Sequence, residues 1–373
     1  MKKSLLALAV LGTFGGAAFA QSTVTLYGIA DAYYQNLDNG PKTTNRIDSG
    51  GLSGSRIGVR GSEDLGNGTS AIFTIEGGIN LDDGSNAQGA VWGRQSFVGL
   101  KGNFGQATIG RHQTPLYDIV VNYGGAGNGQ SIGAASNVFA FANGTPYTTT
   151  ATVVTAPIAR ANNSVKYISP NFSGLTLTAF AAFGENTNNG VKTTAGNTLA
   201  GAAEYKIGAF AASALYQETK ANPTTAVSVD KVRTVAVGAS YNFGVVKPYV
   251  LYQDNKTSNF ASYASTPATT TKSLSNYYVD LGISAPLGAG ALTVDYAFLN
   301  NRNDQGVIGE NGDAKSAGLR YDYSLSKRTT TYAGIQKIWN DSQSAYSLGG
   351  TASLASARGQ DPRTIFLGAR HTF

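Results

Sequence analysis

The sequence predicts an all-β protein, a 16-stranded antiparallel transmembrane β-barrel. Apolar and polar residues alternate with a period of two in many segments, which is typical of strands with one apolar and one polar face. Short turns alternate with long polar connections along the chain, and the last segment ends on an aromatic residue, Phe373. In a closed barrel the apolar faces meet lipid and no strand edge is left unpaired.

The first 20 residues predict a cleaved export signal. Lys2 and Lys3 precede an apolar run at 5–14, and Ala18-Phe-Ala20 supplies the small residues of a cleavage site. Residues 21–373 then form the mature barrel, in which 26 basic and 22 acidic residues give a net charge of +4. Because no later window approaches about 18 apolar residues and cysteine is absent, we exclude a helical membrane protein and a disulfide scaffold.

The alternation recurs from one end of the chain to the other. In the first strand, Val24 and Leu26 lie on one face, and Thr23 and Thr25 lie on the other. The segments that alternate in this way are 22–34, 55–61, 71–77, 175–183, 234–243, 275–285, 292–298, 317–323 and 363–373. The final segment places Ile365, Leu367, Ala369, His371 and Phe373 on the lipid face, and we expect it to close the barrel by pairing with the first strand.

The connections fall into two length classes. Seven short turns lie at 64–68, 102–105, 169–174, 207–208, 242–244, 286–290 and 324–327. Eight longer polar segments lie near 37–52, 81–91, 113–159, 186–196, 219–229, 257–272, 301–311 and 341–362. These connections join sixteen strands, with short turns on one side of the membrane and long loops on the other. A soluble β-sandwich is the alternative fold, but it would hide its apolar faces from lipid.

Several strings resemble the general porins of β-proteobacteria, a trimeric general-diffusion group. They are Val24-Thr-Leu-Tyr-Gly28, Gly54-Ser-Arg-Ile-Gly-Val-Arg-Gly-Ser-Glu-Asp-Leu-Gly66, Gly93-Arg-Gln-Ser-Phe-Val-Gly-Leu100, Thr114-Pro-Leu-Tyr-Asp118, Tyr167-Ile-Ser-Pro-Asn-Phe172 and the ending Arg370-His-Thr-Phe373. The resemblance implies a homotrimer in the outer membrane of a Gram-negative bacterium, in contact with lipid and lipopolysaccharide. It implies passive passage of small ions and solutes without a cofactor, and recognition of Phe373 by the barrel-assembly machinery.

The segment 113–159 is the longest connection, and a loop of this length normally has a function or is disordered. The resemblance implies that it is the third loop, which folds into the lumen and narrows the channel. It contains one carboxylate, Asp118, and its apolar pieces at 119–121 and 138–141 would lie against the inner wall. A disordered external loop is the alternative.

Candidate constriction residues are mostly basic. Arg56 and Arg60 share the polar face of one strand, as do Arg160 and Lys166 of another. The resemblance carries the constriction arginines over to Arg56, Arg94 and Arg160. Arg94 falls on the same strand face as the apolar residues Val98 and Leu100. Either this face contacts the infolded loop, or the strand has a bulge. Glu76 and Asp118 complete the set of charged candidates, and the arginines could instead only brace the wall by pairing with Glu76 or Asp31.

Fixed positive charge in a narrow pore favours anions. The lone Asp118 and the net charge of +4 therefore predict an anion-preferring channel. A substrate-selective porin for a dicarboxylate, phosphate or sugar is an alternative, and so is a barrel with a plugged lumen. Nucleic-acid binding is not expected, because clustered basic runs are absent.

An outer-membrane hydrolase is disfavoured by the sequence. Gly129-Gln-Ser-Ile-Gly133 matches a nucleophile-elbow string, but it lies in the long loop without a strand–helix context. The chain has only two histidines, His112 and His371. We therefore predict no catalytic, cofactor-binding or metal-binding residues.

Overall fold

The computed structural model describes residues 22–40, 42–141, 158–184, 187–188, 191–192, 196–220, 227–228, 231–262, 269–302, 312–342, 344–348 and 358–373. The predicted signal at 1–20 lies outside these residues. The strands are β1 (Thr23–Asp38), β2 (Thr43–Ser49), β3 (Arg56–Gly66), β4 (Thr69–Gly78), β5 (Gln95–Gly102), β6 (Gly105–Gln113), β7 (Arg160–Ile168), β8 (Leu175–Ala182), β9 (Thr187–Asn188), β10 (Val191–Lys192), β11 (Thr198–Ile207), β12 (Phe210–Lys220), β13 (Val227–Ser228), β14 (Lys231–Tyr241), β15 (Lys247–Ser262), β16 (Thr269–Leu287), β17 (Gly290–Asn301), β18 (Ala314–Ser324), β19 (Thr329–Asn340) and β20 (Arg363–Thr372). Two helices, α2 (Pro115–Tyr123) and α3 (Ala135–Phe139), lie between β6 and β7.

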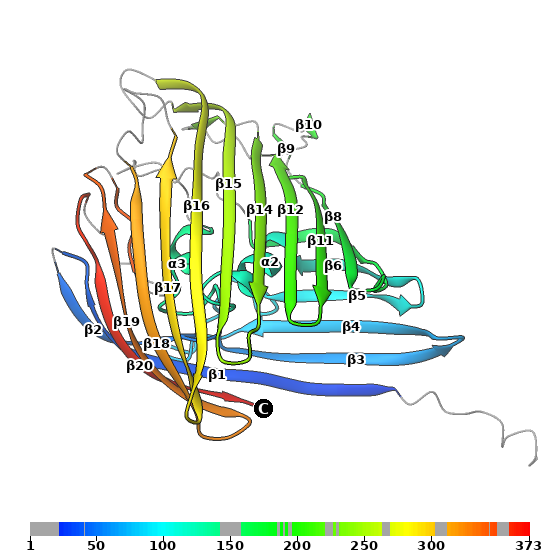
Figure 1. The fold of residues 1–373 in the computed structure, drawn as a ribbon. Coiled ribbons are helices and arrows are strands. Elements are labelled where there is room, and N and C mark those ends of the chain that lie inside the picture. The colour runs from blue at the N-terminus through cyan, green and yellow to red at the C-terminus, as the bar shows by residue number, and fades with distance from the viewer. Residues whose placement is uncertain are drawn as a thin grey trace, which may run out of the picture.

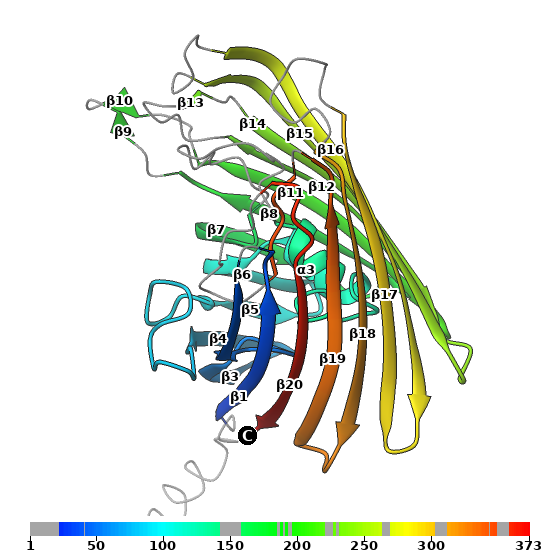
Figure 2. The same ribbon diagram turned by 90° about the vertical axis from the view of Figure 1, so that its left-hand side faces the viewer.

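All strands except β9 and β10, which pair with each other, form one closed antiparallel barrel (Figure 1). Most barrel strands pair with their neighbours in the chain, and β20 pairs with both β19 and β1, so the last strand closes the sheet onto the first. Figure 2 shows β1 and β20 side by side at this seam. Because β2 and β3 both pair with β1, and β13 and β14 both pair with β15, the eighteen strands of this sheet occupy sixteen barrel positions, as predicted.

The side-chain alternation follows the prediction. On β20, Ile365 and Leu367 are about three-fifths exposed on the outer surface, whereas Thr364 and Phe366 are buried on the inner one. The same contrast separates Val294 from Asp295 on β17. Among the described residues, no helix is both long and apolar enough to cross a bilayer.

The closing seam is packed closely around the C-terminal aromatic residue. Gly28 and Phe373 exchange backbone hydrogen bonds, with N–O distances of 3.0 and 3.1 Å. A Cβ atom at Gly28 would lie 2.2 Å from the ring of Phe373. Only glycine therefore leaves room for the terminal ring to cover the first strand.

Several predicted connections contain strand residues, including β13 within 219–229 and both β9 and β10 within 186–196. The segment 37–52 contains strand, because β1 runs to Asp38 and β2 spans 43–49, where Ala32–Asp38 pair with 43–49. The segment 257–272 likewise overlaps both β15 and β16. Polar side chains misled the prediction here, since backbone pairing can continue in the polar strand ends beyond the hydrocarbon region, where the alternation with apolar residues fades.

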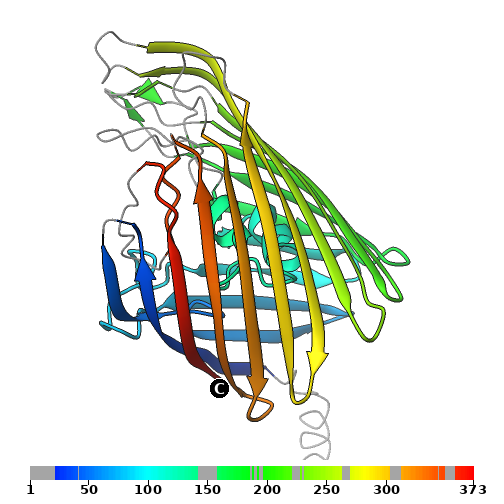
Figure 3. The same ribbon diagram turned by 60° about the vertical axis from the view of Figure 1, so that its left-hand side comes forward.

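The largest apolar core lies between the helices and the barrel wall. Ile119, Val120 and Tyr123 of α2 and Phe139 of α3 are buried. They belong to one cluster with wall residues that include Leu215, Ala236, Leu251, Tyr278 and Ala297. Figure 3 shows both helices between the front and back strands.

Candidate functional site

A buried carboxylate organises the first group of candidate residues. Glu76 on β4 accepts a 2.7 Å ion-pair hydrogen bond from Arg94 Nε and a 3.0 Å hydrogen bond from the hydroxyl of Tyr27 on β1. Arg56 on β3 lies 3.9 Å from the same carboxylate. Antiparallel pairing brings these residues together, because β1, β3 and β4 are neighbours in the sheet.

Arg94 does not follow strand parity, because it lies one residue before β5 begins. Its backbone N–H donates to the carbonyl of Glu76 at 3.1 Å, and its side chain is 3% exposed. The sequence placed Arg94 on an apolar face only because this residue was assumed to be part of the strand. A bulge within β5 is not needed to place it, and Arg94 lines a cavity together with Tyr117 of the segment that follows β6.

A second group lies where β6 and β7 meet the helices. The guanidinium carbon of Arg160 lies 4.7 Å from the ring centroid of Tyr117 in α2. Arg111 on β6 donates from Nε to the carbonyl of Gly93 at 2.7 Å and from Nη1 to Asn162. Since Gly93 directly precedes Arg94, Arg111 links the two groups. Electrostatic repulsion acts between Arg94 and each of Arg56 and Arg160.

Sequence reasoning missed Arg111. It shares parity with the outward Ile109, but the pairing of β6 with β7 shifts register between Gly110 and His112. Gly110 has a φ of 140°, a conformation that side chains rarely adopt and that is common at bulges. A glycine before a basic residue was the signal that could have indicated an inward arginine.

Lys166 and Asp118 form a separate ion pair. Lys166 on β7 donates to Asp118 at 2.7 Å and to the carbonyl of Gln113 at 3.2 Å. The predicted shared parity of Arg160 and Lys166 is interrupted, because Asn163 between them has a φ of 49° at the same register shift. Asp118 is enclosed by the barrel although its side chain is 43% exposed. This enclosure raises the pKa of Asp118, whereas Lys166 acts in the opposite direction.

Arg60 lies apart from both groups. Its guanidinium stacks on the ring of Tyr27 at 5.1 Å, and its side chain is exposed. The alternative brace at Asp31 is not used by these arginines: Asp31 accepts the hydroxyl of Tyr332 at 2.5 Å and the backbone N–H groups of 51–53.

Arg94 and Arg160 line a cavity of about 370 Å³ together with Tyr117, Gln130 and Asn137. Arg94 Nη2 and Arg160 Nε are buried, and neither has a hydrogen-bond partner among the described residues. Counting Arg56, Arg94, Arg111 and Arg160 against Glu76 gives this region a formal charge of +3. Unpaired guanidinium donors in such a region can bind an anion.

The segment between β6 and β7 is held by side chains of the wall. The backbone N–H of Gly125 donates to Asp280 on β16 at 3.2 Å, and that of Ala135 donates to Asp295 on β17 at 2.6 Å. The N–H of Gly133 donates to Gln336 on β19 at 3.1 Å. A Cβ at Gly318 would lie 1.8 Å from the carbonyl oxygen of Gly133. This close contact between the segment and the barrel wall therefore requires glycine at position 318.

The start of α2 follows from its sequence. Thr114 caps the helix by accepting the N–H of Tyr117 at 3.3 Å, and Pro115 occupies the first turn, where its missing N–H costs nothing. The predicted apolar pieces at 119–121 and 138–141 contribute Ile119, Val120 and Phe139 to the buried cluster. Residues 142–157 of the predicted loop lie outside the described residues.

The hydrolase-like string has a structural role. Ser131 donates to the carbonyl of Asn128 at 2.7 Å and accepts from Arg320. His112 instead contacts Ser164 and Thr108 within the wall. In the described part of the chain, no group of three or more histidine or acidic residues is arranged to hold a metal ion.

Comparisons with known proteins give one consistent result. The family model described as Gram-negative porin matches residues 7–343. Outer membrane porin protein 32 of Delftia acidovorans is 36% identical, with both chains covered completely. The structure of an anion-selective porin from Comamonas acidovorans matches with a TM-score of 0.79 and 28% identity, over 95% of this chain and all of that one. A trimer form of OmpT from Vibrio cholerae has the same fold, with a TM-score of 0.66, 16% identity, and coverage of 94% and 99%.

Proposed function

Because the chain belongs to the Gram-negative porin family and is an outer-membrane porin, a passive channel and not an enzyme, we propose that its lumen is a general-diffusion pore that prefers anions. The constriction consists of Arg56, Arg94 and Arg160 with Glu76, joined by Arg111. The observation that supports this most directly is the pair of buried, unpartnered guanidinium nitrogens beside the 370 Å³ cavity. The matching structure from Comamonas acidovorans is an anion-selective porin.

The preference follows from the sign of the local field. Glu76 offsets one of four guanidinium groups, and Asp118 is paired with Lys166. A permeating anion is attracted by the remaining positive charge, and a cation is repelled by it. Low-dielectric protein walls strengthen this effect compared with bulk water.

We propose that the segment 113–159 is the loop that narrows the channel. Its described part places Tyr117 against Arg160 and packs on the inner wall. We further propose that residues 1–20 are a cleaved signal, that the chain forms a homotrimer, as named for the trimer form of OmpT, and that the barrel-assembly machinery recognises Phe373. Arg60 and Lys166 would contribute to the field on either side of the arginine cluster.

General diffusion can be tested by conductance against salt concentration in planar bilayers. We expect the conductance to rise in proportion to KCl concentration, with no block by millimolar succinate, phosphate or glucose, because a general-diffusion pore holds no solute long enough to saturate. A saturating conductance, or a solute that blocks at millimolar concentration, would contradict general diffusion and favour a substrate-selective porin.

Anion preference is expected to increase on acidification. The raised pKa of Asp118 means that its carboxylate takes up a proton as the pH falls toward that value from above, which frees Lys166 and adds one positive charge to the lumen. Reversal potentials between pH 7 and pH 4 measure this change. The Asp118→Asn variant should show the acidic selectivity already at pH 7 and a flatter pH profile.

Glu204 also interacts with Asp118 and is the control position. If Asp118→Asn retained the full pH dependence while Glu204→Gln removed it, the assignment to Asp118 would be wrong.

A further inference from the structure

The outer surface of the barrel has a large groove over β17, β18, β19 and β20. It has a volume of about 890 Å³ and is lined on its apolar side by Val294, Tyr296, Leu319, Ile335 and Ile365. Ala317 lines the same groove and pairs across the sheet with Tyr296 on one side and Lys337 on the other. A small side chain between two large ones leaves a hollow in a surface that otherwise faces lipid.

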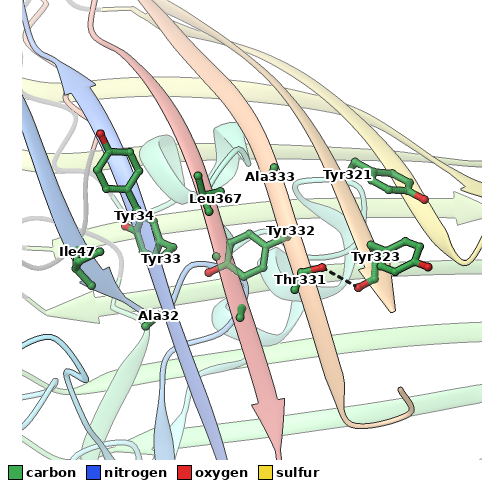
Figure 4. A pocket seen from close by; sticks show the side chains of 12 residues that line it. Ala32, Tyr33, Tyr34, Ile47, Tyr321, Tyr323, Thr331, Tyr332, Ala333 and Leu367 are labelled. Carbon is green, nitrogen blue, oxygen red and sulfur yellow. Dashed lines mark hydrogen bonds between the residues drawn. The ribbon is translucent and has the colours of Figure 1, made fainter. Parts of the chain in front are cut away.

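A second groove of about 590 Å³ continues toward the short-turn end of the same strands. Figure 4 shows Tyr321 and Tyr323 on one side of it, and Leu367 and Tyr34 on the other. Its lining includes Ala333 and Ala369, whose small outward side chains leave it open. From Arg363 to Ala369 the two grooves follow β20 for six residues, or about 20 Å at roughly 3.3 Å per residue, compared with about 15 Å for half of a hydrocarbon core.

Cationic side chains lie at the long-loop end of the first groove. Lys337 on β19 pairs directly with Arg363 on β20, and both line the groove with Trp339. Lys315 on β18 pairs with Trp339. Tryptophan is typical of the membrane interface, so these cations lie at the level of lipid headgroups. Long loops are extracellular in bacterial barrels, which places this rim in the outer leaflet.

The two groove cations have acidic neighbours but remain accessible. Lys337 lies 3.5 Å from Asp361, and Arg363 lies 3.2 Å from Asp38. The side chains of Lys337 and Arg363 are 40% and 71% exposed, and exposed ion pairs of this kind are weak. A phosphate group that carries more than one negative charge can therefore compete with these carboxylates, and arginine binds it through two N–H groups.

We propose that this groove binds a phosphorylated, acylated glycolipid of the outer leaflet, with a phosphate at Lys337 and Arg363 and an acyl chain along Ala317, Ala333 and Leu367. Charge complementarity and the apolar length of the groove select this occupant. The inference deepens the expected contact with lipopolysaccharide by naming its site. It depends on the outer-membrane location and is independent of the anion preference of the pore.

The test is binding of diphosphoryl lipid A to the purified, detergent-solubilised protein, measured by native mass spectrometry. We expect Lys337→Gln plus Arg363→Gln to lower the affinity about tenfold or more. The matched control is Arg233→Gln plus Lys256→Gln, which removes two paired cations from the long-loop half of β14 and β15. Equal losses in both double variants would overturn the site and indicate diffuse charge attraction.

A second variant tests the acyl groove without removing charge. Ala317→Leu fills the hollow with a lipid-compatible side chain, and we expect it to weaken lipid A binding several-fold. Unchanged binding would overturn the acyl part of the proposal, and phosphatidylglycerol binding as tightly as lipid A would overturn the glycolipid assignment. If Ala317→Cys formed disulfides between copies and no lipid was retained, a second copy of the chain would be the occupant. Conductance of the same variants should equal the wild type, so failure here is distinguishable from failure of the pore proposal.

Discussion

In the Arg56→Ala plus Arg160→Ala variant, the ratio of chloride to potassium permeability is expected to fall at least about fivefold. The formal charge of the arginine cluster decreases from +3 to +1. A unit charge roughly 8 Å from a permeating ion changes its energy by about 0.5 to 2 kcal/mol for effective dielectric constants between 80 and 20. The effect has opposite signs for anions and cations, so the ratio responds more than either conductance.

These two arginines are better targets than Arg94. Arg94 forms the 2.7 Å buried ion pair with Glu76, and its removal would leave a buried carboxylate uncompensated. In the double variant Arg94 still holds Glu76, so the wall should stay intact. Arg233→Gln, on the outer surface over the ring of Tyr216, is the control and should leave the ratio unchanged. An unchanged ratio in the double variant would exclude these arginines as the selectivity determinants.

Removing the wall carboxylates is expected to release the segment that bears α2 and α3 and to widen the pore. In Asp280→Ala plus Asp295→Ala, the backbone N–H groups of Gly125 and Ala135 lose their acceptors. Each unsatisfied buried donor costs about 1 to 3 kcal/mol, which favours an alternative position of the loop. We expect higher and noisier single-channel conductance, together with a larger size limit for sugars in liposome swelling.

Asparagine at both positions is the matched control. Asp280→Asn plus Asp295→Asn keeps a carbonyl oxygen as acceptor at each site while removing the charge, and its conductance should stay near that of the wild type. Heat-modifiable migration in gels should show folded barrels for both variants. A folded alanine variant with wild-type conductance and size limit would refute the role of this segment as the constriction.

The barrel was predictable from the sequence because the alternation of apolar and polar residues can be recognised within each strand alone. Every lipid-facing strand must alternate, so Ile365 and Leu367 reveal the outer face and Thr364 the inner one without knowledge of the partner strands. The inward faces of Arg56 and Glu76 follow from the same rule. The ends of β1 and β15 were not predictable, since strands beyond the hydrocarbon region no longer need apolar residues.

The assembled site was only partly predictable. Arg94 lies outside its strand and Arg111 follows a bulge, so parity cannot place either side chain. The contact of Tyr117 with Arg160 joins a helix to a strand more than 40 residues later in the chain, and only the family resemblance suggested that this segment meets the arginines. The anchoring role of Asp280 and Asp295 depends on three-dimensional proximity, and alternation indicated only that they face inward.

The most direct test of the anion-preferring pore is the reversal potential of the wild-type protein in a planar bilayer under a KCl gradient. We predict that the reversal potential, the voltage at which the current is zero, has the sign expected of an anion-selective channel. It should move toward zero when Arg56 and Arg160 are replaced by alanine. A reversal potential on the cation-selective side would contradict the account, because the arginine cluster would then not determine which ions pass.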